Sequence, residues 1–130
     1  MTLDEVVIDA SALMAFLMDE PGGDAVAPYL EVAQICSINF HECIYSLMSK
    51  YHASLEQANA RLTQTSLVVH DYTPHLAVIA ASLQPQADKL GLSLGDRACV
   101  ATALELGLPV VTADKIWKKL KLDIPIICVR

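Results

Sequence analysis

The feature that most constrains the fold of this chain is a glycine-bracketed motif, residues 91–97, that runs directly into a helix of small residues, 98–104. Projected at about 100° per residue, this helix is apolar almost all round, so we expect it to be buried. Asp96 projects on the same side as Cys99 and Ala103. A carboxylate on an apolar face is costly unless it is paired, hydrogen-bonded or bound to a metal.

Two interpretations of Asp96 are open. Ser93 and Asp96 have the spacing of a capping box, with serine at the N-cap and an acid three residues later, which would make Asp96 a structural residue. The other interpretation is a functional acid. A glycine- and proline-containing turn then leads to a strand at residues 110–112 and to a second acid, Asp114. One carboxylate therefore opens a helix and another closes a strand.

Short apolar strands alternate with helices along the whole chain. Strands are predicted at residues 6–8, 35–38, 67–69, 110–112 and 125–129. Helices are predicted at residues 11–19, 24–33, from a cap at Asn39 onward, 55–66, 74–83 and 115–120, with a loop after Pro85. This alternation indicates an α/β fold, a single domain over residues 1–130 with a parallel sheet of about five strands flanked by helices on both faces.

Composition excludes several classes of protein. The 130 residues suffice for one domain, and 54% of them are hydrophobic, which indicates a well-filled core. A formal net charge of −6 argues against a general nucleic-acid coating protein. The acidic start of the chain lacks the basic region of a signal peptide, and no apolar run is long enough to span a bilayer. Four scattered cysteines without a Cys-x-x-Cys pair indicate reduced thiols, so a cytoplasmic location is expected.

Four acids lie where a predicted strand has ended or a predicted helix begins: Asp9, Glu42, Asp96 and Asp114. Each also has a structural interpretation, as a cap or turn residue for Asp9 and as a solvated first-turn acid for Glu42. In parallel sheets the functional crevice lies beyond the carboxyl ends of the strands. Four like charges gathered there would repel, and a hard divalent cation such as Mg²⁺ or Mn²⁺ would relieve that repulsion.

These motifs resemble the PIN-domain family, and within it the VapC-type toxins of bacterial toxin–antitoxin pairs. The resemblance begins at residues 7–13, passes through Glu42, and is most specific at residues 91–97 and 111–114. It implies a metal-dependent endoribonuclease whose catalytic and metal-binding acids correspond to Asp9, Glu42, Asp96 and Asp114. The hydroxyls of Ser11 and Thr112 match positions that support the site. The implied reaction is in-line attack on a phosphodiester by a water activated by Mg²⁺ or Mn²⁺.

The resemblance also implies partners. The substrate would be RNA, and the candidate phosphate contacts are Arg97, Lys115, Lys118, Lys119 and Lys121, each of which is alternatively a solvated surface cation. Such toxins form homodimers and are blocked by a small cognate antitoxin. Contacts to that antitoxin could come from the apolar faces around Leu13, Phe16, Leu17 and Met48.

Other classes of protein fit less well. A receiver-type phosphorylation domain needs an adjacent pair of acids after the first strand, whereas Asp9 stands alone. A haloacid-dehalogenase-type phosphatase needs a second acid where Ser11 stands. The remaining alternative is a non-catalytic PIN-like module that acts only by binding protein or RNA, and an assay of metal-dependent RNA cleavage would distinguish it from the nuclease.

Overall fold

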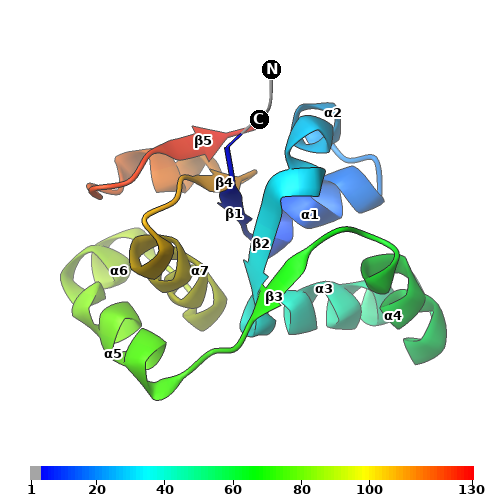
Figure 1. The fold of residues 1–130 in the computed structure, drawn as a ribbon, viewed down its shortest axis with the longest axis horizontal. Coiled ribbons are helices and arrows are strands. Elements are labelled where there is room, and N and C mark those ends of the chain that lie inside the picture. Colours follow the sequence, from blue (N-terminus) through cyan, green and yellow to red (C-terminus); the bar gives the residue numbers. More distant parts are fainter. Residues whose placement is uncertain (1–3) are drawn as a thin grey trace.

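The computed structural model describes residues 4–130 and contains a five-stranded sheet in which every strand pair is parallel (Figure 1). The strands are β1 (Val6–Ile8), β2 (Ala33–Cys36), β3 (Val68–His70), β4 (Val110–Thr112) and β5 (Ile126–Cys128). Their order across the sheet is β3-β2-β1-β4-β5, so β1 is central. The predicted fold class is confirmed. The first three residues of the predicted 1–130 domain lie outside the described residues.

Helices cover both faces of the sheet. They are α1 (Ala10–Leu17), α2 (Gly23–Val26), α3 (Ser37–Ser49), α4 (Leu55–Thr63), α5 (Pro74–Ser82), α6 (Gln84–Leu90) and α7 (Leu94–Leu106), with 3-10 helices η1 (Ala27–Val32) and η2 (Lys115–Lys119). Successive strand residues point to opposite faces. Val6 and Ile8 therefore pack with α1 to α4, whereas Val7 packs with α6 and α7. Because both faces are covered, β1 is buried throughout.

Helix α7 is buried, as its all-round apolar projection predicts. Its buried residues are Gly95, Ala98, Cys99, Val100, Ala101, Thr102 and Ala103. Small side chains let it pack closely against the sheet, and α5 packs on it through Leu76 and Ala80 against Ala101. The helix ends at Gly107, which adopts the left-handed conformation that glycine allows (φ 66°). Because α7 connects back to a parallel strand, its first turn lies at the carboxyl edge of the sheet.

Four local predictions were wrong. Residues 24–33 do not form one helix: α2 ends at Val26, a 3-10 helix with Pro28 in its first turn follows, and Ala33 is already in β2. Helix α3 begins at Ser37, so Asn39 is not its cap. Residues 84–90 are helical, because Pro85 occupies the first turn, where its missing N–H costs nothing. The first helix spans Ala10–Leu17 and not 11–19, whereas its cap, Asp9, agrees with the capping interpretation of that residue.

None of the helices formed by residues 4–130 combines the length and the apolar character needed to cross a membrane.

Candidate functional site

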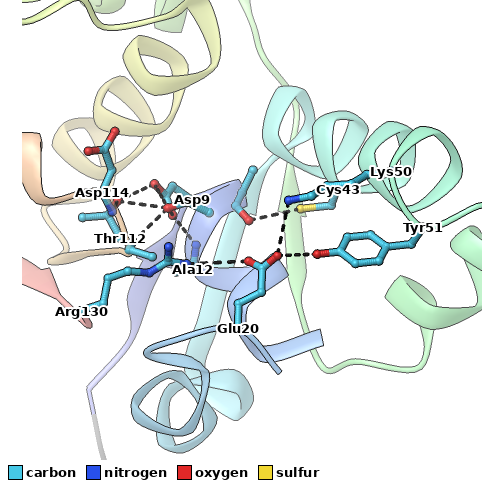
Figure 2. A network of polar contacts seen from close by, with 12 residues as sticks. Asp9, Ala12, Glu20, Cys43, Lys50, Tyr51, Thr112, Asp114 and Arg130 are labelled. Carbon is cyan, nitrogen blue, oxygen red and sulfur yellow. Dashed lines mark hydrogen bonds and ion pairs between the residues drawn. The ribbon is translucent and has the colours of Figure 1, made fainter. Parts of the chain in front are cut away.

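The Asp9 carboxylate lies at the end of β1 and is almost fully buried, with 3% of the residue exposed. It caps α1, since its Oδ1 accepts a hydrogen bond from the backbone N of Ala12 at 2.8 Å. Two hydroxyls also reach it. Thr112 Oγ1 donates to Oδ2 at 2.6 Å (Figure 2), and Ser11 Oγ lies 2.8 and 2.9 Å from the two oxygens. The capping interpretation is therefore confirmed, but capping accounts for only part of the hydrogen bonding at Asp9.

Ser11 and Thr112 connect the ends of β1 and β4. The backbone N of Ala113 donates to Ser11 Oγ at 3.0 Å, and the backbone N of Asp114 donates to Thr112 Oγ1 at 3.0 Å. Each hydroxyl thus donates to Asp9 while accepting from the segment that carries Asp114. This arrangement fixes the orientation of one carboxylate and the backbone position of the other.

Burial raises the pKa of Asp9 from 3.8 to about 6. The hydrogen bonds from Thr112, Ala12 and Ser11 oppose this rise, because they stabilise the charged form, while the negative charge of Asp96 adds to it. The carboxylate is therefore held in a place where ionisation is costly.

Asp96 has both of the properties that its sequence position suggested. The capping box is present: Ser93 Oγ accepts from the backbone N of Asp96 at 3.1 Å, and Asp96 Oδ2 accepts from the backbone N of Ser93 at 3.0 Å. Its pKa is nevertheless raised, first by burial and further by the charge of Asp114, although the hydrogen bonds with Ser93 and the charge of Arg97 lower it. Asp96 is thus a cap that lies beside other acids.

Glu42 is held against the first turn of α7 by Asn39, which was predicted only as a helix cap. Asn39 is 1% exposed, and its Nδ2 donates to Glu42 Oε1 at 2.9 Å and to the carbonyl O of Gly95 at 3.0 Å. A Cβ atom on Gly95 would collide with the Glu42 carboxylate. Burial raises the pKa of Glu42, and the nearby charge of Asp96 raises it further.

The structure therefore places three carboxylates within electrostatic reach of Asp96: its charge acts on Asp9 and Glu42, and the charge of Asp114 acts on it. Asp114 is exposed and caps η2, with Oδ1 accepting from the backbone N of Ile116 at 3.0 Å.

As they stand, no three acidic, histidine or cysteine side chains in residues 4–130 are close enough together to hold a metal ion. Each of the four carboxylates instead accepts a hydrogen bond from its own neighbourhood. The donor set still suits Mg²⁺ or Mn²⁺, because these ions prefer carboxylate oxygens and keep several waters between themselves and the protein. Mutual repulsion among the acids is also what a bound cation would relieve.

The predicted basic residues do not share one location. Arg97 folds back on its own helix, where its Nε donates to the carbonyl O of Ser93 at 3.1 Å. Lys115 and Lys118 lie on η2, directly after Asp114, and are exposed. Lys119 and Lys121 line a separate cavity of about 490 Å³ beside α6, together with Lys89 of that helix.

Three residues beside the acids were missed: Glu20, Lys50 and Arg130 line a cleft of about 320 Å³ together with Ser11 and Glu42. The spacing of Glu42, Ser46 and Lys50, four residues apart each time, was a usable signal, because it places all three side chains along one face of a helix. Neither Glu20 nor Arg130 carries such a signal, since only the tertiary fold brings them to α3.

A parallel α/β sheet with buried and half-buried acids beyond its carboxyl ends defines a class of small domain that is suited to binding a cation and a phosphate at that edge. Comparison with known families specifies the class further. The PIN domain family matches residues 6–122, so the chain belongs to the PIN domain family. Comparison with curated proteins gives no significant match.

Several solved structures share this fold. The DNA-bound VapBC complex from Salmonella typhimurium is similar with a TM-score of 0.72 and 20% identity, covering 95% of this chain and 97% of that one. VapBC2 from Rickettsia felis, bound to a DNA fragment from its promoter, has a TM-score of 0.70 and 17% identity, covering 93% of this chain and 97% of that one. A toxin–antitoxin complex from Klebsiella pneumoniae has a TM-score of 0.69 and 18% identity, covering 89% of this chain and 92% of that one. At these identities the likeness establishes the fold.

Proposed function

We propose that this protein is a divalent-metal-dependent endoribonuclease and the toxin of a VapC-type toxin–antitoxin pair, with residues 1–130 forming one PIN domain that dimerises and acts in the cytoplasm. Membership of the PIN domain family supports this, and so does a fold shared with chains of VapBC complexes. The observation that carries the proposal is the position of Asp96, beside Asp9, Glu42 and Asp114 at the carboxyl edge of the sheet.

In this proposal Asp9, Glu42, Asp96 and Asp114 would hold Mg²⁺ or Mn²⁺. When bound, the cation would neutralise phosphate charge and supply a water of lowered pKa. The protein's own contribution is orientation. Ser11 and Thr112 hold the Asp9 carboxylate. On the other side, Asn39 holds Glu42 against α7.

Binding of RNA by an acidic protein requires local positive charge. Lys115 and Lys118 are exposed on η2 directly after Asp114, which suits them to phosphate contacts flanking the acids. Arg97 and Lys119 remain candidates for the same role. Arg97 adjoins Asp96, and Lys119 faces the cavity beside α6.

The proposed protein partner is a small antitoxin. Phe16 and Met48 are 36% and 37% exposed, so they can contribute to an apolar interface, and Leu17 is half-buried. Leu13 was wrongly included in that surface, because it lies on the buried side of α1 and is fully enclosed in the core.

The test is RNA cleavage by the purified protein, freed of any antitoxin, with Mg²⁺ or Mn²⁺ and with EDTA. We expect cleavage only with the metal. Asp9→Asn and Asp96→Asn should each lower the rate at least ~10²-fold, the usual effect of removing one electrostatic stabiliser. Lys118→Ala is the control and should cost far less.

Undiminished cleavage in EDTA would exclude the metal mechanism. Absence of cleavage with every metal, together with retained binding of RNA or protein, would instead favour the non-catalytic binding module.

A further inference from the structure

The cleft beside Glu42 combines acidic and basic walls. The lining residues of this cavity of about 320 Å³ include Ser11, Glu42, Glu20, Lys50 and Arg130. These side chains come from α1, from the turn after it, from α3 and the residue that follows it, and from the segment after β5. The cleft therefore brings two cations, from distant parts of the sequence, next to the proposed nuclease acids.

The Glu20 carboxylate forms ion pairs with both cations of the cleft, Lys50 and Arg130. Lys50 Nζ lies 3.7 Å from Glu20 Oε2, and Arg130 Nη2 lies 3.7 Å from Glu20 Oε1. Tyr51 anchors the same carboxylate, because its hydroxyl donates to Oε2. Figure 2 shows Arg130 on the side of Glu20 that faces Asp9 and Ala12, with Lys50 and Tyr51 reaching Glu20 from the segment just after α3. Two positive charges thus share the single negative charge of Glu20, and among the described residues the second carboxylate of the cleft, Glu42, has no ion pair with either cation.

Both ion pairs are loose enough to be exchanged for a ligand. Their separations exceed hydrogen-bonding distance, and the Lys50 and Arg130 side chains are 66% and 35% exposed. The Glu20 side chain that they share is 23% exposed, and pairs this widely spaced near the surface contribute only ~0–1 kcal/mol to stability. A guanidinium presents a planar fork that matches a phosphate, and a lysine adds a mobile point charge. The two cations are thus available while Tyr51 keeps Glu20 in place.

We propose that Lys50 and Arg130 form a phosphate site for the RNA strand, one that takes a phosphate neighbouring the one at the carboxylates. This inference rests on the proposed function and extends it to the substrate path. The cleft includes Ser11 and Glu42, so a strand positioned at the acids passes directly by the two cations. Without them, an acidic edge in a chain of net charge −6 would repel the flanking phosphates.

The experiment measures binding of a mixed-sequence single-stranded RNA by fluorescence anisotropy over a series of salt concentrations. Ca²⁺ replaces Mg²⁺, and a gel verifies that the RNA stays intact. The double variant Lys50→Ala/Arg130→Ala should bind about 10-fold more weakly. The slope of log K against log salt should fall in magnitude by about 0.7, the value for one phosphate contact to a single strand.

Two further variants separate a built site from a loss of net charge or of folding. Arg61→Ala also removes a positive charge but lies on α4 and does not line the cleft, so its binding should match the wild type. Glu20→Gln keeps an acceptor for the Tyr51 hydroxyl while it releases both cations, so it should bind RNA several-fold more tightly. Thermal unfolding of each variant verifies that it is folded.

Wild-type affinity and salt slope in the double variant would overturn the site, as would equal losses in the double variant and in Arg61→Ala. Weaker binding by Glu20→Gln would also contradict it. An effect of the double variant on binding of a protein partner alone, with RNA binding unchanged, would overturn it too. These failures leave the proposed nuclease intact, because wild-type cleavage with Mg²⁺ is measured separately.

Discussion

At the scale of single residues, the Asp9 carboxylate links the fold to its chemistry. Its pKa is raised by burial from 3.8 to about 6, so the folded protein holds this proton more tightly than the unfolded chain does. The contribution of protonated Asp9 to the free energy of unfolding is fully present below about pH 4, near the pKa of the unfolded chain. It is lost as the pH rises through the folded value near 6, because the unfolded state then ionises at lower cost.

The pH dependence of stability should therefore change when Asp9 is replaced. We expect the free energy of unfolding of the wild type in EDTA to fall by about 2 kcal/mol relative to Asp9→Asn between pH 4 and pH 7, because the pKa of Asp9 is 3.8 in the unfolded chain and about 6 in the folded protein. Urea denaturation at a series of pH values measures this difference. Parallel pH profiles for the two proteins would show that Asp9 is not buried in its charged form.

Residues that act through near neighbours could be predicted from the sequence, and residues that act through distant ones could not. Asp9 and Asp114 directly follow strand patterns, and Ser11 and Thr112 lie two residues away from them. Asn39, by contrast, reaches Gly95, which is 56 residues further along the chain. No periodicity or spacing within one element reveals a contact of that kind.

At the scale of elements, the site depends on the approach of α3 to α7. Gly95 lies in the first turn of α7, and the space that its missing side chain leaves is filled by the Glu42 carboxylate. Asn39 bridges the two helices at the same point through Glu42 and the Gly95 carbonyl. The position of Glu42 is therefore set by packing between two helices.

Gly95→Ala should separate activity from stability. Alanine is favoured over glycine in a helix by up to ~1 kcal/mol, and the colliding group is the end of a flexible side chain, so the melting temperature should hold or rise. Displacement of Glu42 should nevertheless lower the cleavage rate at least ~10-fold, about 1.4 kcal/mol of barrier.

Glu42→Gln provides the matched partner for a double-mutant cycle. If Gly95→Ala acts through Glu42, the two substitutions should be strongly non-additive in the cleavage rate. Additive losses would place the effect of Gly95→Ala elsewhere.

Helices and strands with a strong apolar pattern could be predicted from the sequence. Where an element begins or ends was harder to predict, because it depended on how single residues such as proline fit the local backbone. The central strand β1 and helix α7 are continuous apolar segments, and both form where expected. Pro85 was interpreted as a helix breaker, but it occupies a first turn, where proline is favoured. Pro28 was expected inside one continuous helix, but α2 ends just before it and a 3-10 helix follows.

At the scale of the whole molecule, the topology concentrates negative charge. Parallel strands deliver Asp9 and Asp114 to one edge of the sheet, and crossover helices bring Glu42 and Asp96 to the same place. Burial raises the pKa of Asp96, and the charge of Asp114 adds to that rise, so repulsion between the acids is a cost to the folded state. The free energy of unfolding of the whole domain should therefore change when a cation binds at this edge of the sheet.

Asp96→Asn should reveal that coupling. Asparagine still accepts a hydrogen bond from the backbone N of Ser93, so the cap is largely kept. In EDTA the variant should be as stable as the wild type or more stable, because one repelling charge is gone. In excess Mg²⁺ or Mn²⁺ the wild type should gain RT ln(1 + [L]/Kd), about 2.7 kcal/mol at a metal concentration of ~100 Kd, and the variant should forfeit most of that gain.

Thermal unfolding of both proteins, with EDTA and with metal, yields four melting temperatures and one coupling term. A coupling near zero, with the same destabilisation of Asp96→Asn in both buffers, would mean that Asp96 acts only as the cap of α7. A metal-dependent coupling would mean that the same carboxylate both starts the helix and contributes to the cation site, because only the second role responds to the ion. The capping box and the raised pKa of Asp96 coexist in the fold, so we expect the metal-dependent result.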